Sequence, residues 1–278
     1  MEHERRRDPS RGRELAVLTR SLITRRASRD LVDAATAERD YVLAHVVAQL
    51  HLATSKDGGR LVFKGGTALR FVYFEDYRYS ADLDFSVTNG DLAAAFAALG
   101  GAVVAAKAHA GFPHLELVEA KHRMLSYIGP LGGLRPHTLK VDFSGEEYVD
   151  SIAQGAVMAI WEDLPEPAAF DVYPLEEITA EKLRCVMQRV QCRDMYDLFR
   201  LTEDARMPLV ELRPLFEAKA RTKSLDPGRF AECFEGRVRS YRRTWDKEMG
   251  RHLAEPPPFQ EVERVVRRHL RGSGYLTS

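Results

Sequence analysis

Apolar and polar positions divide the chain into a first part of mixed character and a second part with helical spacing throughout. A short apolar run from Leu61 to Phe63 is typical of a strand, and Gly65 and Gly66 interrupt it before helical spacing resumes. Alternating patterns predict further strands through residues 82–85, 114–120, 124–128, 138–144, 157–161 and 170–173. Helical periodicity predicts helices at 13–27, 34–54, 92–108, 176–190, 194–203, 208–221, 226–249 with a break, and 259–271.

This order of elements predicts an α+β protein. We expect a disordered charged tail at residues 1–12, a domain with a mixed sheet at 13–173 and an α-helical domain at 174–278. Asp91 is expected to cap the alanine-rich helix that follows it. With 278 residues, each of the two domains has room for its own core.

Composition narrows the class of protein without identifying a partner. Basic and acidic residues balance at 41 each, so the overall charge does not predict nucleic-acid binding, although a local basic patch would still permit it. Three cysteines without a C-x-x-C spacing argue against a disulfide framework or a zinc site. We expect no membrane-spanning run and no signal peptide, and therefore a cytoplasmic protein without a membrane partner.

Candidate chemistry gathers between residues 63 and 85. Gly65 and Gly66, between a strand and a helix start, can cradle phosphate because backbone N–H groups approach it and the helix N-terminus adds positive charge. Asp82 and Asp84 alternate with apolar residues, so a strand would place both carboxylates on one face, roughly 7 Å apart. Such a pair suits one or two Mg²⁺ ions that carry a triphosphate. The alternative interpretation is an ordinary solvated strand face.

Asp142 offers a third carboxylate from another predicted strand. Alternation along residues 139–143 turns the apolar side chains inward and Asp142 toward the other face. The alternatives are a half-exposed acid on an ordinary strand, or a ligand taken instead from Glu146 or Glu147 in the following loop.

Four residues around these acids have two interpretations each. Lys64 is either a phosphate ligand or a solvated lysine at the strand end. Thr67 can donate its hydroxyl or its N–H to phosphate, and Ser80 lies near the expected triphosphate or caps a turn. Arg78 either contacts phosphate or pairs with Asp82.

A second cluster lies in the helical part. On the predicted helix 176–190, Lys182 and Arg189 fall near the same side, and on the next helix Asp194 and Asp197 are one turn apart. Taken from the residues alone, helix capping and surface salt bridges account for this cluster.

These motifs resemble a known superfamily. Gly65-Gly66 followed by Asp82-Leu83-Asp84 is similar to the nucleotidyltransferase signature of the DNA polymerase β superfamily. The longer string, Lys64 to Leu69 with Arg78, Ser80 and the two aspartates, resembles the AbiEii/AbiGii (MenT-like) toxin family, and the second cluster matches the same family. The resemblance covers roughly residues 60–200, and the long spacer between glycines and aspartates suits the toxin branch.

The resemblance implies a polymerase-β-like nucleotidyltransferase domain with a mixed sheet, followed by an α-helical domain. It implies one or two Mg²⁺ ions on Asp82, Asp84 and Asp142, with Asp142 helping to activate the attacking hydroxyl. Lys182 would contact the nucleotide, and Asp194 would complete the site or orient a basic residue. The nucleotide-binding residues are then Lys64, Gly65, Gly66, Thr67, Ser80 and Lys182.

The resemblance also implies a biological setting. The protein would be a toxin of a bacterial toxin–antitoxin or abortive-infection pair, with a cognate antitoxin as its partner. It would transfer NMP from an NTP to an RNA acceptor, expected to be the 3′ end of tRNA, and so block translation.

The last third of the chain carries a local excess of arginine. Basic residues interleave with Tyr241 and Trp245, and arginines with exposed aromatic side chains can follow a phosphate backbone and stack on bases. The candidate RNA-binding residues are Arg237, Arg242, Arg243, Lys247, Arg267 and Arg268. The alternative is a solvated helix face with Trp245 buried.

Two rival functions remain open at this point. A nucleotidyltransferase acting on a small molecule such as an aminoglycoside predicts an acidic acceptor groove and indifference to RNA. A non-catalytic RNA- or nucleotide-binding regulator predicts that the aspartates serve structure alone.

Overall fold

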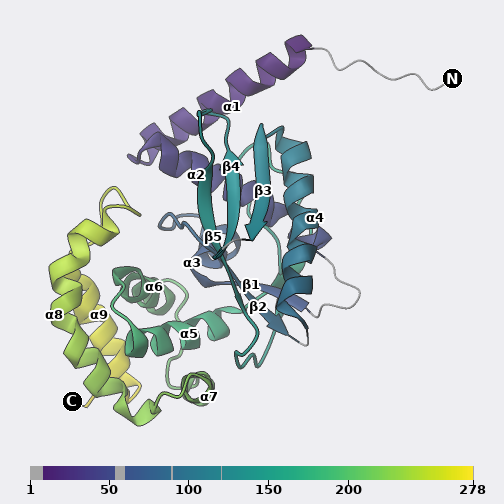
Figure 1. Cartoon of the computed structure of the whole chain (residues 1–278). Helices are drawn as coiled ribbons and strands as arrows, with labels where there is room; N and C mark the ends of the chain where they lie inside the picture. Colours follow the sequence, from purple (N-terminus) through teal and green to yellow (C-terminus); the bar gives the residue numbers. More distant parts are fainter. Residues whose placement is uncertain (1–8, 54–59, 89, 120, 278) are drawn as a thin grey trace.

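The structure, a computed structural model, sets a mixed β-sheet with flanking helices beside a group of C-terminal helices (Figure 1). It describes residues 9–53, 60–88, 90–119 and 121–277, with side chains described from residue 19 onward. Within these residues the sheet has seven strands in the order β3-β4-β5-β2-β1-β7-β6.

Three strands lie next to one another in the middle of the sheet. β1 (Arg60–Lys64) and β2 (Leu83–Thr88) pair antiparallel, and β5 (His137–Ser144) lies parallel to β2 on its other side. β7 (Phe170–Val172) lies parallel to β1. β4 (Arg123–Ile128) and β3 (His114–Glu119) extend one edge, and β6 (Ala153–Gly155) forms the other.

Helices surround this sheet in the first part of the chain. α1 (Pro9–Arg29), α2 (Ala34–Ala48) and a 3₁₀ turn (Leu50–Leu52) precede β1, while α3 (Gly65–Ala68) and a π-helical segment (Leu69–Tyr73) connect β1 to β2. α4 (Leu92–Ala110) follows β2 and packs against α2 and β3. Asp91 caps α4 as expected, because its Oδ1 accepts the N–H of Ala93 at 3.1 Å.

One expectation about apolar runs is wrong. By its length of 19 residues and its mean hydropathy of 1.5, α4 is apolar enough to cross a membrane. Its face formed by Ala95, Leu99, Ala102, Val103 and Ala106 is buried, and the helix packs on α2 and β3. The remaining residues of α4 are exposed or half-buried, so the helix covers α2 and the sheet with one face only.

The second part of the chain is helical as predicted. It contains α5 (Leu175–Gln188), α6 (Cys192–Glu203), α7 (Arg213–Thr222), a 3₁₀ turn (Pro227–Arg229), α8 (Phe230–Met249) and α9 (Phe259–Gly272). α5 contacts α6, α7 and α8, and α9 packs against α6 and α8. In Figure 1, α5 and α6 lie on the side toward the sheet, and α8 and α9 lie side by side on the outside.

Four elements differ from the sequence-based expectation. The strand predicted at 157–161 is an irregular segment, and the edge strand lies at Ala153–Gly155 instead. The apolar run misled because Val157 and Trp161 are buried from an irregular segment, where Trp161 Nε1 lies 3.3 Å from the Asp40 carboxylate. α7 begins at Arg213 rather than at 208, and α8 runs unbroken from Phe230 because Pro227 falls in the preceding 3₁₀ turn. α1 begins at Pro9, inside the expected tail, whereas residues 1–8 lie outside the described part.

Candidate active site

Three neighbouring strands place charged side chains abreast. Lys64 on β1 pairs in register with Asp84 on β2, and Asp84 pairs in register with Asp142 on β5. Directly opposite residues on adjacent strands share a face of the sheet, so these three side chains lie side by side. Asp82, two residues before Asp84, enters β2 on the same side by alternation. We call Asp82, Asp84 and Asp142 the acidic row.

The glycine turn lies directly against the acidic row. Gly65 has a φ of 79°, and a Cβ atom there would stand 2.5 Å from Oδ2 of Asp84. A Cβ on Gly66 would stand 2.2 Å from Nη2 of Arg78. Both positions therefore exclude a side chain, the first because of its backbone conformation and close contact, the second because of close contact. The turn and the acids are in contact, as the sequence predicts.

Two hydroxyl groups hold the segment that leads into β2. The Thr67 hydroxyl lies 2.8 Å from Oγ of Ser80 and 2.5 Å from the carbonyl oxygen of Asp82, and both side chains are buried. The Thr67 hydroxyl is thus engaged within the protein, and its backbone N–H remains the group predicted to meet phosphate. Ser80 faces Thr67 rather than a turn of its own.

The acidic row carries unbalanced negative charge. Burial, followed by the nearby carboxylates of Asp82, Glu181 and Asp142, raises the pKa of Asp84 to about 6, although the Lys64 ammonium opposes this rise. The Asp142 carboxylate forms an ion pair with Lys140, whose Nζ lies 2.5 Å from Oδ2. Like charges held this close are what a divalent cation would neutralise.

The donor set of the acidic row fits a hard cation. Carboxylate oxygens are the protein ligands that Mg²⁺ prefers, and Asp84 and Asp142 lie in register on adjacent strands beside the glycine turn. Asp82 is engaged by Arg193, whose Nη1 lies 3.3 Å from Oδ2. In the described part of the chain, no three His, Cys, Asp or Glu side chains already surround a common point closely enough to hold a metal ion. A cation held by all three carboxylates would compete with Arg193 for Asp82.

Lys64 is buried and paired rather than solvated. Its ammonium contacts Glu147 and lies 3.2 Å from Oε1 of Glu181. Burial disfavours the charged form, but the carboxylates of Glu181 and Glu147 outweigh it and raise the pKa of Lys64. Burial likewise opposes ionisation of Glu181, but Lys64 and Arg184 hold its pKa down at about 2.

A second group of charges ties the helical part to the glycine turn. Lys182 Nζ lies 2.9 Å from Asp194 and 2.7 Å from Asp197. Arg78 donates two hydrogen bonds to Asp197, at 2.6 and 2.7 Å, and Arg189 donates two to Asp194, at 2.9 and 3.2 Å. We call these five residues the paired cluster.

The structure contradicts two sequence-based interpretations of residues in the paired cluster. Arg78 is neither paired with Asp82 nor free for phosphate, because the Nε and Nη2 edge of its guanidinium is bound to Asp197 and Nη1 donates to the Tyr79 carbonyl. Nor are the aspartates on a solvated helix surface, since Asp194 and Asp197 are fully buried. Burial works against their ionisation, yet Lys182 with Arg189 lowers the pKa of Asp194, and Arg78 with Lys182 lowers that of Asp197.

One cleft joins the two charge groups. It has a volume of about 210 Å³ and is lined by Gly65, Asp84 and Asp142 from the sheet side and by Lys182 and Arg189 from α5 and its end. Sequence reasoning did not assign three further lining residues, Glu181, Arg184 and Cys185. Glu181 and Arg184 flank Lys182 in the helix motif, and their neighbouring position was the one signal available.

The basic C-terminal residues fall into two groups. Tyr241 and Trp245 are buried, so the expectation that they stack on bases is wrong. Four of the six candidate residues bind within the protein: Arg237 donates to the Cys233 carbonyl, Arg242 pairs with Glu263, Arg267 with Glu235 and Glu263, and Arg268 with Glu203. Arg243 and Lys247 are exposed and make no ion pair with any described residue.

A mixed sheet that sets a Gly-Gly turn against carboxylates of adjacent central strands defines a nucleotidyltransferase. Comparison with known families agrees: residues 47–268 match the family described as "Nucleotidyl transferase AbiEii toxin, Type IV TA system". The chain therefore belongs to the AbiEii nucleotidyltransferase toxin family, as the sequence motifs indicate.

A solved structure shares the fold. The chain is similar to MenT4, the nucleotidyltransferase toxin Rv2826c from Mycobacterium tuberculosis H37Rv, with a TM-score of 0.70 and 21% sequence identity. The similarity covers 93% of this chain and 89% of that chain. No curated protein sequence gave a significant match.

Proposed function

We propose that this nucleotidyltransferase toxin transfers a nucleoside monophosphate from an NTP to a hydroxyl of an RNA acceptor in a Mg²⁺-dependent reaction. The proposed acceptor is the 3′ end of tRNA, whose modification would block translation in the cytoplasm until a cognate antitoxin restrains the enzyme. The observation that carries the proposal is the contact of the glycine turn with Asp84, in a row with Asp142.

The acidic row would hold the metal in this reaction. Bound there, Mg²⁺ would neutralise phosphate charge and stabilise the departing pyrophosphate. Asp142, which lines the cleft, would take the proton of the attacking hydroxyl. The acceptor oxygen then forms a bond to the α-phosphorus, and the bond from that phosphorus to the bridging oxygen of the β-phosphate breaks.

The helical side of the cleft would supply fixed positive charge. Lys182 and Arg189 are oriented by the same buried carboxylate, Asp194, so they need no rearrangement when a triphosphate enters. Gly65 and the N–H of Thr67 would meet the phosphates from the sheet side. Lys64 is a proposed phosphate ligand at the same edge, held in place by Glu147 and Glu181.

The proposal is tested by incubating purified protein with α-labelled NTPs, Mg²⁺ and total bacterial RNA. We expect label on a small RNA, lost when the metal is chelated and restored when Mg²⁺ is returned. Asp84→Asn should reduce labelling by on the order of 10²–10³-fold, because it removes a charge from the centre of the acidic row. Asp204→Asn, at the exposed end of α6, serves as the matched control and should label normally.

Each rival function predicts a different result in the same assay. Label on an added aminoglycoside and none on RNA would favour the small-molecule acceptor. Undiminished label with Asp84→Asn would remove the acidic row from the reaction. A wild-type protein that binds RNA but labels nothing with any of the four NTPs would favour the non-catalytic regulator.

A further inference from the structure

Four basic side chains form one line along the exposed side of α8. Arg239, Arg243 and Lys247 follow each other at intervals of four residues, and Arg251 continues the series in the turn after the helix. Side chains four residues apart on a helix are neighbours, about 6 Å apart along its axis. All four are exposed, and none pairs with another described residue. We call them the α8 basic row.

The α8 basic row differs from two neighbouring arginines that are paired, whereas Arg264 and Arg271 of α9 are exposed without an ion pair to any described residue. Arg242, next to it, pairs with Glu263 of α9 at 2.8 Å, and Arg268 pairs with Glu203 at 2.6 Å. Like charges at four-residue spacing destabilise a helix, and an anionic partner would reverse that effect. Asp246 is the one exposed acid between Arg239 and Arg251.

The end of the α8 basic row reaches the candidate active site. His252, directly after Arg251, lies with its Nδ1 2.9 Å from the Tyr79 carbonyl oxygen, and its own carbonyl accepts the Tyr79 N–H at 2.9 Å. Tyr79 stands three residues before Asp82. The turn that follows α8 is therefore hydrogen-bonded to the segment that carries Asp82, the first carboxylate of the acidic row.

A second contact joins the same helix end to the same carboxylate. Glu248 of α8 accepts the backbone N–H of Cys192 at 3.1 Å, at the start of α6. The next residue, Arg193, pairs with Asp82. A ligand lying along the α8 basic row would thus arrive where two chain segments meet Asp82.

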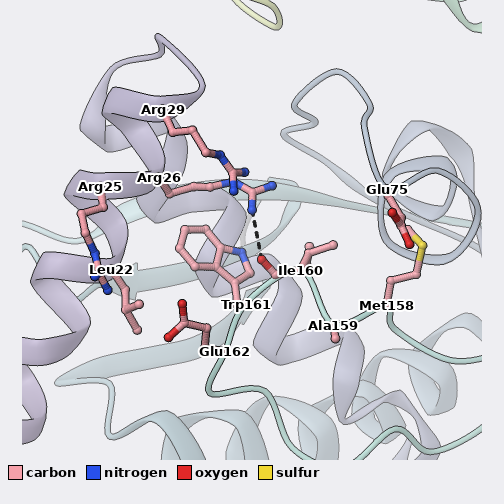
Figure 2. Close-up of a pocket in the computed structure, with 10 residues that line it drawn as sticks. All are labelled: Leu22, Arg25, Arg26, Arg29, Glu75, Met158, Ala159, Ile160, Trp161 and Glu162. Atoms are coloured by element: carbon pink, nitrogen blue, oxygen red, sulfur yellow. Dashed lines mark hydrogen bonds between the residues drawn. The ribbon is translucent and has the colours of Figure 1, made fainter.

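The other arginine-rich surface of the protein has a different charge balance. A groove of about 540 Å³ lies between α1 and the 158–162 segment and is lined by Arg25, Arg26 and Arg29 (Figure 2). Arg26 and Arg29 both bind the Asp30 carboxylate at 2.7 Å. Glu75 and Glu162 line the same groove, so its positive charge is offset by acids. The side chains of the α8 basic row make no ion pair with a described residue, and Asp246 is the one exposed acid between its ends.

We propose that the α8 basic row binds the phosphate backbone of the acceptor RNA and directs its end toward the cleft. The identity of the acceptor as RNA rests on the proposed function. The axial spacing of the row is comparable to that of consecutive phosphates along an RNA strand. Such contacts position a nucleic acid through charge and carry no sequence information of their own.

RNA binding by a catalytically inactive protein separates docking from chemistry. Asp84→Asn protein is titrated with a fluorescently labelled pool of bacterial tRNA over a range of salt concentrations. Adding Arg243→Gln and Lys247→Gln should weaken binding about 20-fold at 150 mM salt and make the slope of log K against log salt shallower by about 1.5, because each lost phosphate contact removes 0.7–0.9. In the active enzyme the same two changes should raise the KM for tRNA and leave the KM for NTP unchanged.

The matched control removes the same charge elsewhere. Arg25 and Arg271 are exposed and make no ion pair with any described residue, and neither belongs to the α8 basic row. Arg25→Gln/Arg271→Gln should leave tRNA affinity within about twofold of the parent. If the row variant and this control bind tRNA with the same affinity and the same salt slope, the proposal is wrong. That outcome includes the case in which the α8 basic row binds an acidic protein instead of RNA. Row-dependent tRNA binding by a wild-type enzyme that transfers no nucleotide would support the docking surface and contradict the proposed reaction.

Discussion

The acidic row and the paired cluster contain the same kind of side chain in opposite environments. In the acidic row, burial and neighbouring carboxylates raise the pKa of Asp84 to about 6. In the paired cluster, Lys182 and two arginines lower the pKa of Asp194 and Asp197 although both are fully buried. Asp84 has more negative than positive charge around it, whereas each aspartate of the paired cluster contacts two cations.

This difference separates chemistry from scaffolding. A buried carboxylate with matched cations is already neutralised and stabilises the native arrangement of its partners. A crowded carboxylate without matched cations costs stability, and it is retained where a ligand or metal supplies the missing charge. The contrast supports the proposal that Asp84 and its row take part in catalysis and that Asp194 orients Lys182 and Arg189.

The largest expected effect comes from breaking the paired cluster. Asp197→Ala leaves the Arg78 guanidinium buried without a carboxylate, so we expect a loss of about 3–5 kcal/mol in the free energy of unfolding. For a chain of this size the melting temperature should fall by at least about 6 °C. Thermal unfolding followed by circular dichroism measures this loss.

An exposed ion pair provides the control for that substitution. Glu232 binds Arg229 at 2.7 Å on the surface, and Glu232→Ala should leave the melting temperature unchanged. A fall for Asp197→Ala no larger than that for Glu232→Ala would mean that the paired cluster does not hold the two parts of the chain together.

The next expected effect is an increase in the free energy of unfolding, and its size depends on pH. Because the folded pKa of Asp84 lies above its unfolded value, the folded state takes up a proton first as pH falls from about 6 to 4, and stability rises over that window. Asp84→Asn removes the charge, so in metal-free protein at pH 7 it should stabilise by on the order of 2 kcal/mol, a gain that disappears toward pH 4.

The readout is the difference between variant and wild type in chelator-containing buffer. Other groups titrate in the same range. Burial lowers the pKa of His252 to about 4, so the free energy of unfolding falls as the pH drops below about 6.5. Subtracting the two unfolding curves removes that contribution. A destabilised Asp84→Asn protein, or a constant difference across pH 4–7, would contradict the charge imbalance assigned to the acidic row.

Local pattern predicted much of the fold because many elements bury a regular face. The helix predicted at 259–271 is α9, and its Val262, Val265, Val266 and Leu270 are buried at helical spacing. The same reasoning failed at 157–161, where an apolar run forms an irregular segment with only Val157 and Trp161 buried. Tertiary packing decided that segment, and no local signal distinguishes it from a short strand.

The candidate site likewise has one part that the sequence predicted and one part that it did not. The contact of the glycine turn with the aspartates follows from strand alternation, and the sequence predicted it. The ion pairs do not follow from local pattern, because Arg78 and Asp197 lie 119 positions apart and Lys64 reaches Glu181 across 117. Whether a lysine or arginine is solvated or paired depends on such distant partners, so the interpretations of Lys64 and Arg78 stayed open until the structure.

The smallest expected effect lies at Arg193, which joins the acidic row to α6. Its ion pair with Asp82 is partly exposed, so Arg193→Ala should change the free energy of unfolding by less than about 1 kcal/mol. The same substitution releases Asp82, and the Mg²⁺ concentration that gives half-maximal activity should fall by about two- to fivefold. Arg189→Ala is the counterpart in the paired cluster: it removes two hydrogen bonds from a buried carboxylate and should destabilise by about 1–2 kcal/mol without lowering the Mg²⁺ requirement. If Arg193→Ala instead raised the KM for NTP with an unchanged Mg²⁺ requirement, Arg193 would be a phosphate ligand, and the competition between arginine and metal for Asp82 would be wrong.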